Sequence, residues 1–182
     1  MGPIQTAVSA LEKYCSRSSL LAGLYSLPYK KVVQREVELA RITSRDRVLN
    51  VGCGAIPFTA IHVANLTGAQ VWAMDRDGEA VEHARFCLKK MGMTGQIQVI
   101  EGDASLCIPS NFTAAIVALQ AEPKALILDN MLSSALQESR LVFRHPCLSY
   151  ESHYDRLPSS YCYTGQVEHN MQTFDRSLLF VK

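Results

Sequence analysis

Hydrophobic residues recur along this chain with two periods, one typical of helices and one typical of buried strands. Apolar residues spaced by three and four predict a helix over residues 4–16, and a second helix from Pro28 to about Arg41. Beyond residue 46, short apolar runs alternate with stretches of helical spacing. The runs predict strands at 47–51, 70–74, 97–100, 114–119 and 140–143, and the stretches predict helices at 57–66, 78–91 and 123–135.

The alternation of strands and helices predicts an α/β fold with an open, mostly parallel sheet that helices cover on both faces. The tail differs, because runs at 161–167 and 177–181 predict a hairpin that forms an antiparallel edge of the sheet. We therefore expect a Rossmann-like domain over residues 46–182. A helical cap over residues 1–45 would precede it, and the two would form one compact unit.

Composition narrows the classes of partner. The 182 residues carry a formal net charge of +1, and the 18 basic residues are spread along the chain, so we expect a small-molecule substrate and no nucleic acid. Apolar runs are broken well before the length of a membrane span, so no membrane partner is expected and the predicted location is the cytoplasm. Six cysteines without a C-x-x-C pair predict reduced thiols, and no metal site is predicted.

The first predicted strand runs into a glycine turn, Gly52-Cys53-Gly54. Glycine is required where the backbone turns sharply and a ligand lies directly against it. Asp75 ends the second strand about 20 residues further on, where a carboxylate can accept hydrogen bonds from both hydroxyls of a ribose. Arg76 follows it and joins the predicted binding set. Together these residues predict a nucleoside site at the carboxyl ends of the strands.

The third strand adds Gly102, Asp103 and Ala104, which place small residues and an acid where an adenine would lie. Three strand ends would then converge on one nucleoside-shaped slot. The alternative is that Asp75 and Asp103 only cap the helices that follow them.

Pro57 indicates which nucleoside the slot would hold. A dinucleotide site has a third glycine at this position, so that pyrophosphate can rest on the helix N-terminus. A proline there favours a nucleoside without phosphate, such as S-adenosylmethionine, as the bound co-substrate. A nicotinamide-dependent oxidoreductase is correspondingly disfavoured.

These residues resemble a known family. The chain carries, in this order, a strand, Gly-x-Gly, an acid after strand two and Gly-Asp after strand three. Over residues 47–143, this order is similar to that of the class I S-adenosylmethionine-dependent methyltransferases. The loop at 52–59 is more narrowly similar to the Gly-x-Gly-x-x-Pro-x-Thr loop of nicotianamine synthases and their archaeal and bacterial relatives. The segments that extend this narrower resemblance are 121–124, 140–144, 177–182 and Tyr29.

The narrower resemblance implies transfer of the 3-amino-3-carboxypropyl group of S-adenosylmethionine to a small amine or amino acid, with release of methylthioadenosine. The enzyme then has to align the amine with the leaving sulfur and keep it deprotonated. Tyr29, which matches a tyrosine of the family's reaction chamber, and Glu122, which follows strand four, are the implied catalytic residues. Arg144 and His145, after strand five, are candidates for binding a substrate carboxylate. The open alternatives are a packing role for Tyr29, a favourable interaction with the dipole of the following helix for Glu122, and a surface role for Arg144.

The sequence departs from the family in its N-terminal region, since only about 45 residues precede the first strand. A chamber completed by a second subunit, in a homodimer, is one way to accommodate this. The tail tyrosines are expected to shape either an acceptor pocket or a dimer surface; they are Tyr150, Tyr154, Tyr161 and Tyr163. Two other functions stay open: a small-molecule methyltransferase, and a module that binds S-adenosylmethionine without catalysis.

Overall fold

The computed structural model describes residues 19–182, and side chains from residue 29 onward, so the predicted helix at 4–16 lies outside it. Seven strands form one sheet in the order β3-β2-β1-β4-β5-β7-β6. The strands are β1 (Arg47–Val51), β2 (Gln70–Asp75), β3 (Ile97–Glu101), β4 (Ala114–Val117), β5 (Arg140–Pro146), β6 (Gly165–Glu168) and β7 (Phe174–Val181). The helices are α2 (Ser19–Leu39), α3 (Phe58–Thr67), α4 (Gly78–Lys90) and α5 (Lys124–Ser134).

The five strands β3, β2, β1, β4 and β5 are parallel, whereas β7 runs antiparallel to both β5 and β6. The predicted antiparallel edge is thus confirmed. All four residues of β4 are buried, which is typical of a central parallel strand covered on both faces. After β3 the chain passes back across the sheet, and β4 is added on the side of β1 that faces away from β2. The strand order therefore reverses between β1 and β4. A crevice for ligands is expected at such a point.

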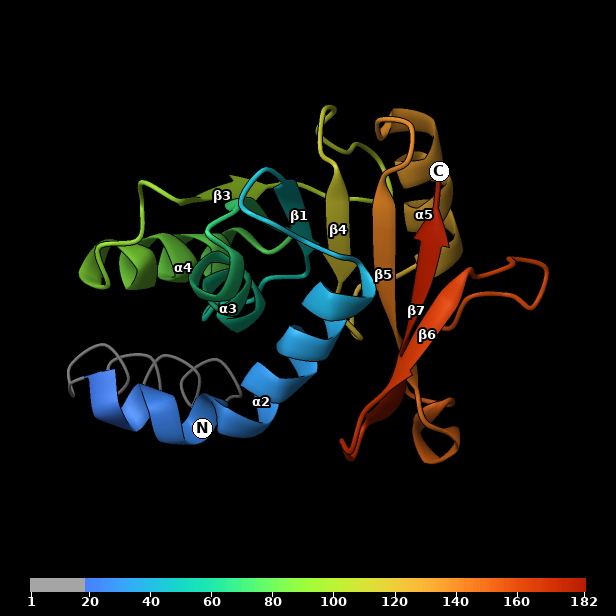
Figure 1. Ribbon diagram of the computed structural model, residues 1–182, viewed down its shortest axis with the longest axis horizontal. Helices are drawn as coiled ribbons and strands as arrows, with labels where there is room; N and C mark the ends of the chain where they lie inside the picture. Colours follow the sequence, from blue (N-terminus) through green and yellow to red (C-terminus); the bar gives the residue numbers. More distant parts are fainter. Residues whose placement is uncertain (1–18) are drawn as a thin grey trace.

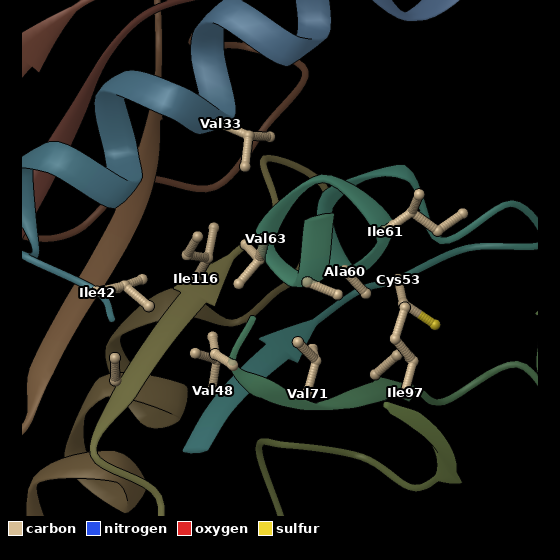
Figure 2. Close-up of a cluster of buried hydrophobic side chains, with 14 of the residues drawn as sticks. Val33, Ile42, Val48, Cys53, Ala60, Ile61, Val63, Val71, Ile97 and Ile116 are labelled. Atoms are coloured by element: carbon tan, nitrogen blue, oxygen red, sulfur yellow. The ribbon is translucent and has the colours of Figure 1, made fainter. Parts of the chain in front are cut away.

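Two apolar clusters cover the two faces of the sheet. One packs α2, α3 and α4 on alternate residues of the parallel strands, and the other packs α5 on the remaining ones. Figure 1 shows α3 and α4 on the side of the sheet away from α5. Figure 2 shows Val33 of α2 at the top, Val63 of α3 beside Ile116 of β4 below it, and Val48 of β1 lower still. The described part of the predicted cap therefore packs on the sheet.

Three details of the sequence prediction are wrong. Helix α2 is already present at Ser19, the first described residue, and continues through Pro28, where the sequence predicts a helix start. A proline inside a helix removes one hydrogen bond and bends the helix, and Figure 1 shows α2 bending along its length. The sequence predicts an amphipathic helix at 78–91 whose apolar residues include Phe86 and Met91, but these two are 48% and 38% exposed, because they lie off the stripe that Val81, Ala84 and Leu88 bury. Strand β5 extends to Pro146, three residues beyond the predicted end.

Among residues 19–182, no helix has both the length and the apolar character that crossing a bilayer requires.

Candidate functional site

The turn after β1 requires its glycines. Gly52 and Gly54 have φ values of +75° and +67°, a region that other residues seldom adopt. A Cβ on Gly52 would also lie 3.1 Å from the Cβ of Ala118. No atom lies within 4 Å of where a Cβ of Gly54 would be, so the space beside that residue is open. The loop therefore turns tightly and leaves room beside its backbone, as the sequence predicted.

Asp75 ties this loop to the second strand. Its Oδ2 accepts a hydrogen bond from the N–H of Gly54 at 2.7 Å, and its Oδ1 accepts one from the N–H of Asp77 at 3.1 Å. A carboxylate has about four acceptor positions, so both oxygens retain capacity for a ligand. The helix cap that we considered as an alternative role belongs to Asp77, whose side chain accepts from the N–H of Glu79.

The turn after β3 brings the third group of predicted residues to the same place. The N–H of Gly102 donates to the carbonyl of Asp75 at 2.9 Å, which joins the ends of β3 and β2. Asp103 Oδ1 accepts from the N–H and hydroxyl of Ser105, and these hydrogen bonds lower the pKa of Asp103. Ala104 is buried beside them. The acid is therefore ionised at neutral pH and faces the slot.

These strand ends surround a cavity of about 360 Å³. Seven residues that the sequence predicted for the site line it: Gly52, Asp75, Arg76, Gly102, Asp103, Ala104 and Glu122. Cys53, Gly54 and Pro57 do not line it, although they form the adjoining loop. The residues that sequence reasoning missed are Val51, Met74, Gln120, Ala121, Ile127 and His153. The first four lie at or shortly after the end of a strand, a signal that could have found them, but Ile127 lies in α5 and His153 in a long connection with no such signal. Tyr154, one of the tail tyrosines that the sequence assigned to an acceptor pocket or a dimer surface, also lines the cavity.

The far end of the cavity is formed by the segment after β4. Glu122 is exposed, and its carbonyl accepts from Arg76 at 3.4 Å. Next to it, Lys124 is buried and donates from Nζ to the carbonyls of Leu119 and Ala121, at 2.5 and 3.1 Å. Burial lowers the pKa of Lys124 to about 8. Lys124 thus fixes the backbone that presents Glu122.

Tyr29 and Arg144 lie together in a buried polar network under α2, beside the cavity and not among its lining residues. Arg144 donates from Nε and Nη2 to the two carboxylate oxygens of Glu36, each at 2.8 Å. It also donates to the hydroxyl of Tyr29 and, at 3.1 Å, to that of Thr59. Glu36 Oε1 accepts a further hydrogen bond from Ser177 at 2.7 Å.

The charge of this network is balanced internally. Burial alone would lower the pKa of Arg144, but the Glu36 carboxylate outweighs burial and raises it above the ordinary value. His169 lies at the edge of the network, where its Nε2 is 2.9 Å from the Ser177 hydroxyl and burial lowers its pKa. The network fixes Tyr29 next to Thr59, in the first turn of α3 and directly after the glycine loop.

His145 and Cys53 are predicted site residues that do not line the cavity. His145 is half-buried, with Nδ1 2.9 Å from the carbonyl of Pro146. Cys53 is buried, and burial together with the charge of Asp75 raises the pKa of its thiol to about 12, so it stays a neutral thiol. Among the described residues, no three His, Cys, Asp or Glu side chains gather in a way that could hold a metal ion.

No family model matches the chain. By sequence, the chain is 30% identical over 131 residues to an L-histidine 2-aminobutanoyltransferase of Yersinia pestis. The matched region covers 72% of this chain and 49% of that protein. A protein of the same name from Pseudomonas aeruginosa is 26% identical over 144 residues, covering 76% of this chain and 55% of that protein. The chain spans about half the length of these curated relatives.

Solved structures show the same relationship. A variant of MtNAS, a nicotianamine synthase, in complex with S-adenosylmethionine superposes with a TM-score of 0.82 at 21% identity, over 96% of this chain and 71% of that one. The chain has the class I methyltransferase fold. An RNA methyltransferase from Salinibacter ruber, in complex with S-adenosyl-L-homocysteine, has a TM-score of 0.69 at 18% identity, over 84% of this chain and 90% of that one. The predicted resemblance to nicotianamine synthase-like proteins is confirmed.

Proposed function

We propose that this chain binds S-adenosylmethionine and transfers its 3-amino-3-carboxypropyl group to the amine of a small acceptor, releasing methylthioadenosine. The observation that supports this most directly is the cavity at the ends of β1, β2 and β3, in which the glycine loop, Asp75 and Asp103 converge. The proposal also rests on sequence similarity to aminobutanoyltransferases.

The groups around the cavity suit an adenosine at one end. The proposed ribose partner is Asp75, whose carboxylate oxygens each have an acceptor position beyond the contacts to Gly54 and Asp77. Gly102 and Ala104 line the cavity and are the proposed neighbours of the base, and the ionised Asp103 would accept a hydrogen bond from an exocyclic amine. Pro57 directly precedes α3 where a dinucleotide site has glycine, so pyrophosphate is not the proposed ligand.

The reaction would be a displacement at a carbon that the sulfonium activates. The amine nitrogen forms a bond to the terminal carbon of the aminocarboxypropyl chain, the bond from that carbon to sulfur breaks, and the electron pair leaves with methylthioadenosine. One proton leaves the nitrogen. This chain has to align the amine with the sulfur and to take up or hold that proton, which requires positioned polar groups and no covalent intermediate.

Glu122 and Tyr29 are the proposed residues for the amine. Glu122 presents a carboxylate at the cavity, where it would hold an amino group by a charge-assisted hydrogen bond. Tyr29 would act beside the glycine loop, where Arg144 and Thr59 hold its hydroxyl. The bidentate pair of Arg144 with Glu36 supports a role in holding Tyr29, and direct contact of Arg144 or His145 with a substrate carboxylate stays a prediction.

The proposed setting is the cytoplasm, because Cys53 is a buried thiol that forms no disulfide, of the kind that reducing compartments maintain. A homodimer remains part of the proposal, to be tested by light scattering. The binding claim is tested by calorimetry with S-adenosylmethionine and with NAD. Micromolar binding of S-adenosylmethionine and weaker binding of NAD are expected, whereas tighter binding of NAD would overturn the assignment of the cavity.

The activity is tested by incubating the protein with S-adenosylmethionine and a pool of amino acids and identifying the nucleoside by-product by mass spectrometry. Methylthioadenosine above the spontaneous background is expected. S-adenosylhomocysteine in its place would show methyl transfer, which the shared fold also allows. A Tyr29→Phe variant should form less methylthioadenosine at unchanged affinity for S-adenosylmethionine, because it removes only the hydroxyl.

A further inference from the structure

Lys124, at the start of α5, is a buried charged residue next to the wall of the cavity. Only 1% of it is exposed, and lysine is seldom buried so completely. Burial disfavours its charged form and lowers its pKa to about 8. A methionine at this position would avoid that cost. The side chain of Lys124 does not line the cavity, so we expect the ammonium to matter through the groups that it holds.

The ammonium holds the turn between β4 and α5. Its Nζ donates hydrogen bonds to the carbonyl of Leu119 at 2.5 Å and to the carbonyl of Ala121 at 3.1 Å. All of residues 120–122, which belong to this turn, line the cavity. Hydrogen bonds from a charged donor are shorter and stronger than those between neutral groups. The ammonium therefore fixes the course of the backbone from which Glu122 extends.

The backbone N–H of Lys124 holds a second segment of the wall. It donates to Oδ2 of Asp155 at 2.6 Å. The first N–H groups of a helix have no partner within it, and Pro123, at the N-cap of α5, makes no side-chain hydrogen bond to them. Asp155 supplies an acceptor from the connection after β5, where it directly follows His153 and Tyr154, which line the cavity. One residue thus joins two segments of the wall.

The proposed adenosine contacts lie in another part of the cavity. They come from Asp75 and residues 102–104, which follow β2 and β3, and we call this part the cofactor end. In the sheet, β1 separates β2 and β3 from β4. Loss of the ammonium would therefore disturb the wall after β4 more than the cofactor end. A displacement is sensitive to such a change, because misplacing a group by about 1 Å can slow a reaction about 100-fold.

We infer that Lys124 is a positioning residue for the proposed transfer. Its ammonium holds the turn that presents Glu122, and its N–H holds, through Asp155, the segment that carries His153 and Tyr154. This inference rests on the proposed function and adds a residue that acts without touching either substrate. Loss of the ammonium slows the transfer step and leaves the binding of S-adenosylmethionine nearly unchanged.

The test separates turnover from cofactor binding in Lys124→Met, which removes the ammonium and keeps the backbone N–H. The full chain is given S-adenosylmethionine and a fixed pool of amino acids, and methylthioadenosine is measured by mass spectrometry. The apparent kcat should fall at least tenfold. The KM for S-adenosylmethionine, and its Kd by calorimetry, should stay within threefold of the values for the unaltered protein.

Lys182→Met is the matched control. Lys182 makes the same kind of contact at the other end of α5, where its Nζ donates to the carbonyls of Ser133 and Ala135 at 3.2 and 2.6 Å, and it does not line the cavity. This variant should keep the apparent kcat of the unaltered protein. An unchanged apparent kcat in Lys124→Met would overturn the inference. An equal fall in the control, or a loss of cofactor affinity as large as the fall in kcat, would also overturn it, because a merely structural role gives that result.

Asp155 tests the same junction from its other side, and it decides the matter if Lys124→Met does not fold. Asp155→Ala removes the acceptor of the Lys124 N–H, and the apparent kcat should fall at least fivefold at unchanged Kd for S-adenosylmethionine. Asp155→Asn keeps an oxygen that can accept this hydrogen bond, so it should retain most of the activity. Equal activity of Asp155→Ala and the unaltered protein would contradict the inference.

The inference and the proposed function fail in different ways. If the unaltered protein binds no S-adenosylmethionine, or releases no methylthioadenosine from it, the proposed function fails and the inference fails with it. If the unaltered protein releases methylthioadenosine and Lys124→Met releases it equally fast, only the inference about Lys124 fails.

Discussion

Replacing Asp75 by alanine tests the proposed nucleoside site at its central residue. Its two oxygens accept hydrogen bonds from the N–H groups of Gly54, at 2.7 Å, and Asp77, at 3.1 Å. The substitution would remove the anchor of the glycine loop together with the proposed ribose contact. Leaving polar groups of this kind unpaired costs about 1 to 3 kcal/mol, so the Kd for S-adenosylmethionine should rise roughly 5- to 140-fold.

The assay is calorimetric titration of S-adenosylmethionine into the unaltered protein and the variant, after urea unfolding has shown that both are folded. Asp77→Ala is the matched control, because Asp77 caps α4 through the N–H of Glu79 at 3.0 Å and does not line the cavity. It should lower the free energy of unfolding by about 1 kcal/mol and leave the Kd unchanged. Unchanged affinity in Asp75→Ala, or an equal loss in the control, would refute the assignment of Asp75.

Three further substitutions have defined outcomes. Gly102→Ala would place a Cβ 2.7 Å from the Cε of Met74, so the Met74 side chain has to move within the cavity that it lines. Calorimetry should then show several-fold weaker binding of S-adenosylmethionine, and unchanged binding would contradict this. Arg144→Met would leave the buried Glu36 carboxylate without its cation. Urea unfolding should show that the free energy of unfolding falls by about 3 to 5 kcal/mol, whereas a fall of less than about 1 kcal/mol would show that the pair is not needed for folding. For Lys124, burial lowers the pKa from 10.5 to about 8, so the unfolded chain binds more protons between these values and this side chain makes stability rise with pH there. From pH 8 to pH 10, the free energy of unfolding of the unaltered protein should therefore rise relative to that of Lys124→Met. A difference that stays constant over this pH range would contradict the burial of a charged amine.

Much of the cofactor end could be predicted from the sequence because its signals are local. A glycine turn directly after an apolar run, and acids directly after the next two runs, need no knowledge of distant contacts. Once the strands are parallel, their carboxyl ends meet at one edge, and Gly52, Asp75 and Asp103 come together. The antiparallel edge could be predicted for the same reason, since two short apolar runs with a turn between them indicate a hairpin.

The arrangement of the far end of the cavity, beyond β4 and β5, could not be predicted in this way. His153 and Tyr154 lie in a long connection whose spacing has no helical or strand period, and their position depends on the contact of Asp155 with Lys124, 31 residues away in the sequence. The ion pair of Arg144 with Glu36 spans 108 residues. Each of these side chains has an ordinary surface role in most sequences, so only the tertiary structure reveals that His153 and Tyr154 line the cavity and that Arg144 and Glu36 are buried together.

The central claim is that the bond broken at sulfur is the one to the aminocarboxypropyl chain. The most direct measurement supplies S-adenosylmethionine labelled with ¹³C in its methyl group, together with a pool of amino acids, and follows the label by mass spectrometry. The account predicts that all the label stays in methylthioadenosine and that the acceptor gains an unlabelled aminocarboxypropyl group. Label in the acceptor, with S-adenosylhomocysteine as the nucleoside product, would contradict it.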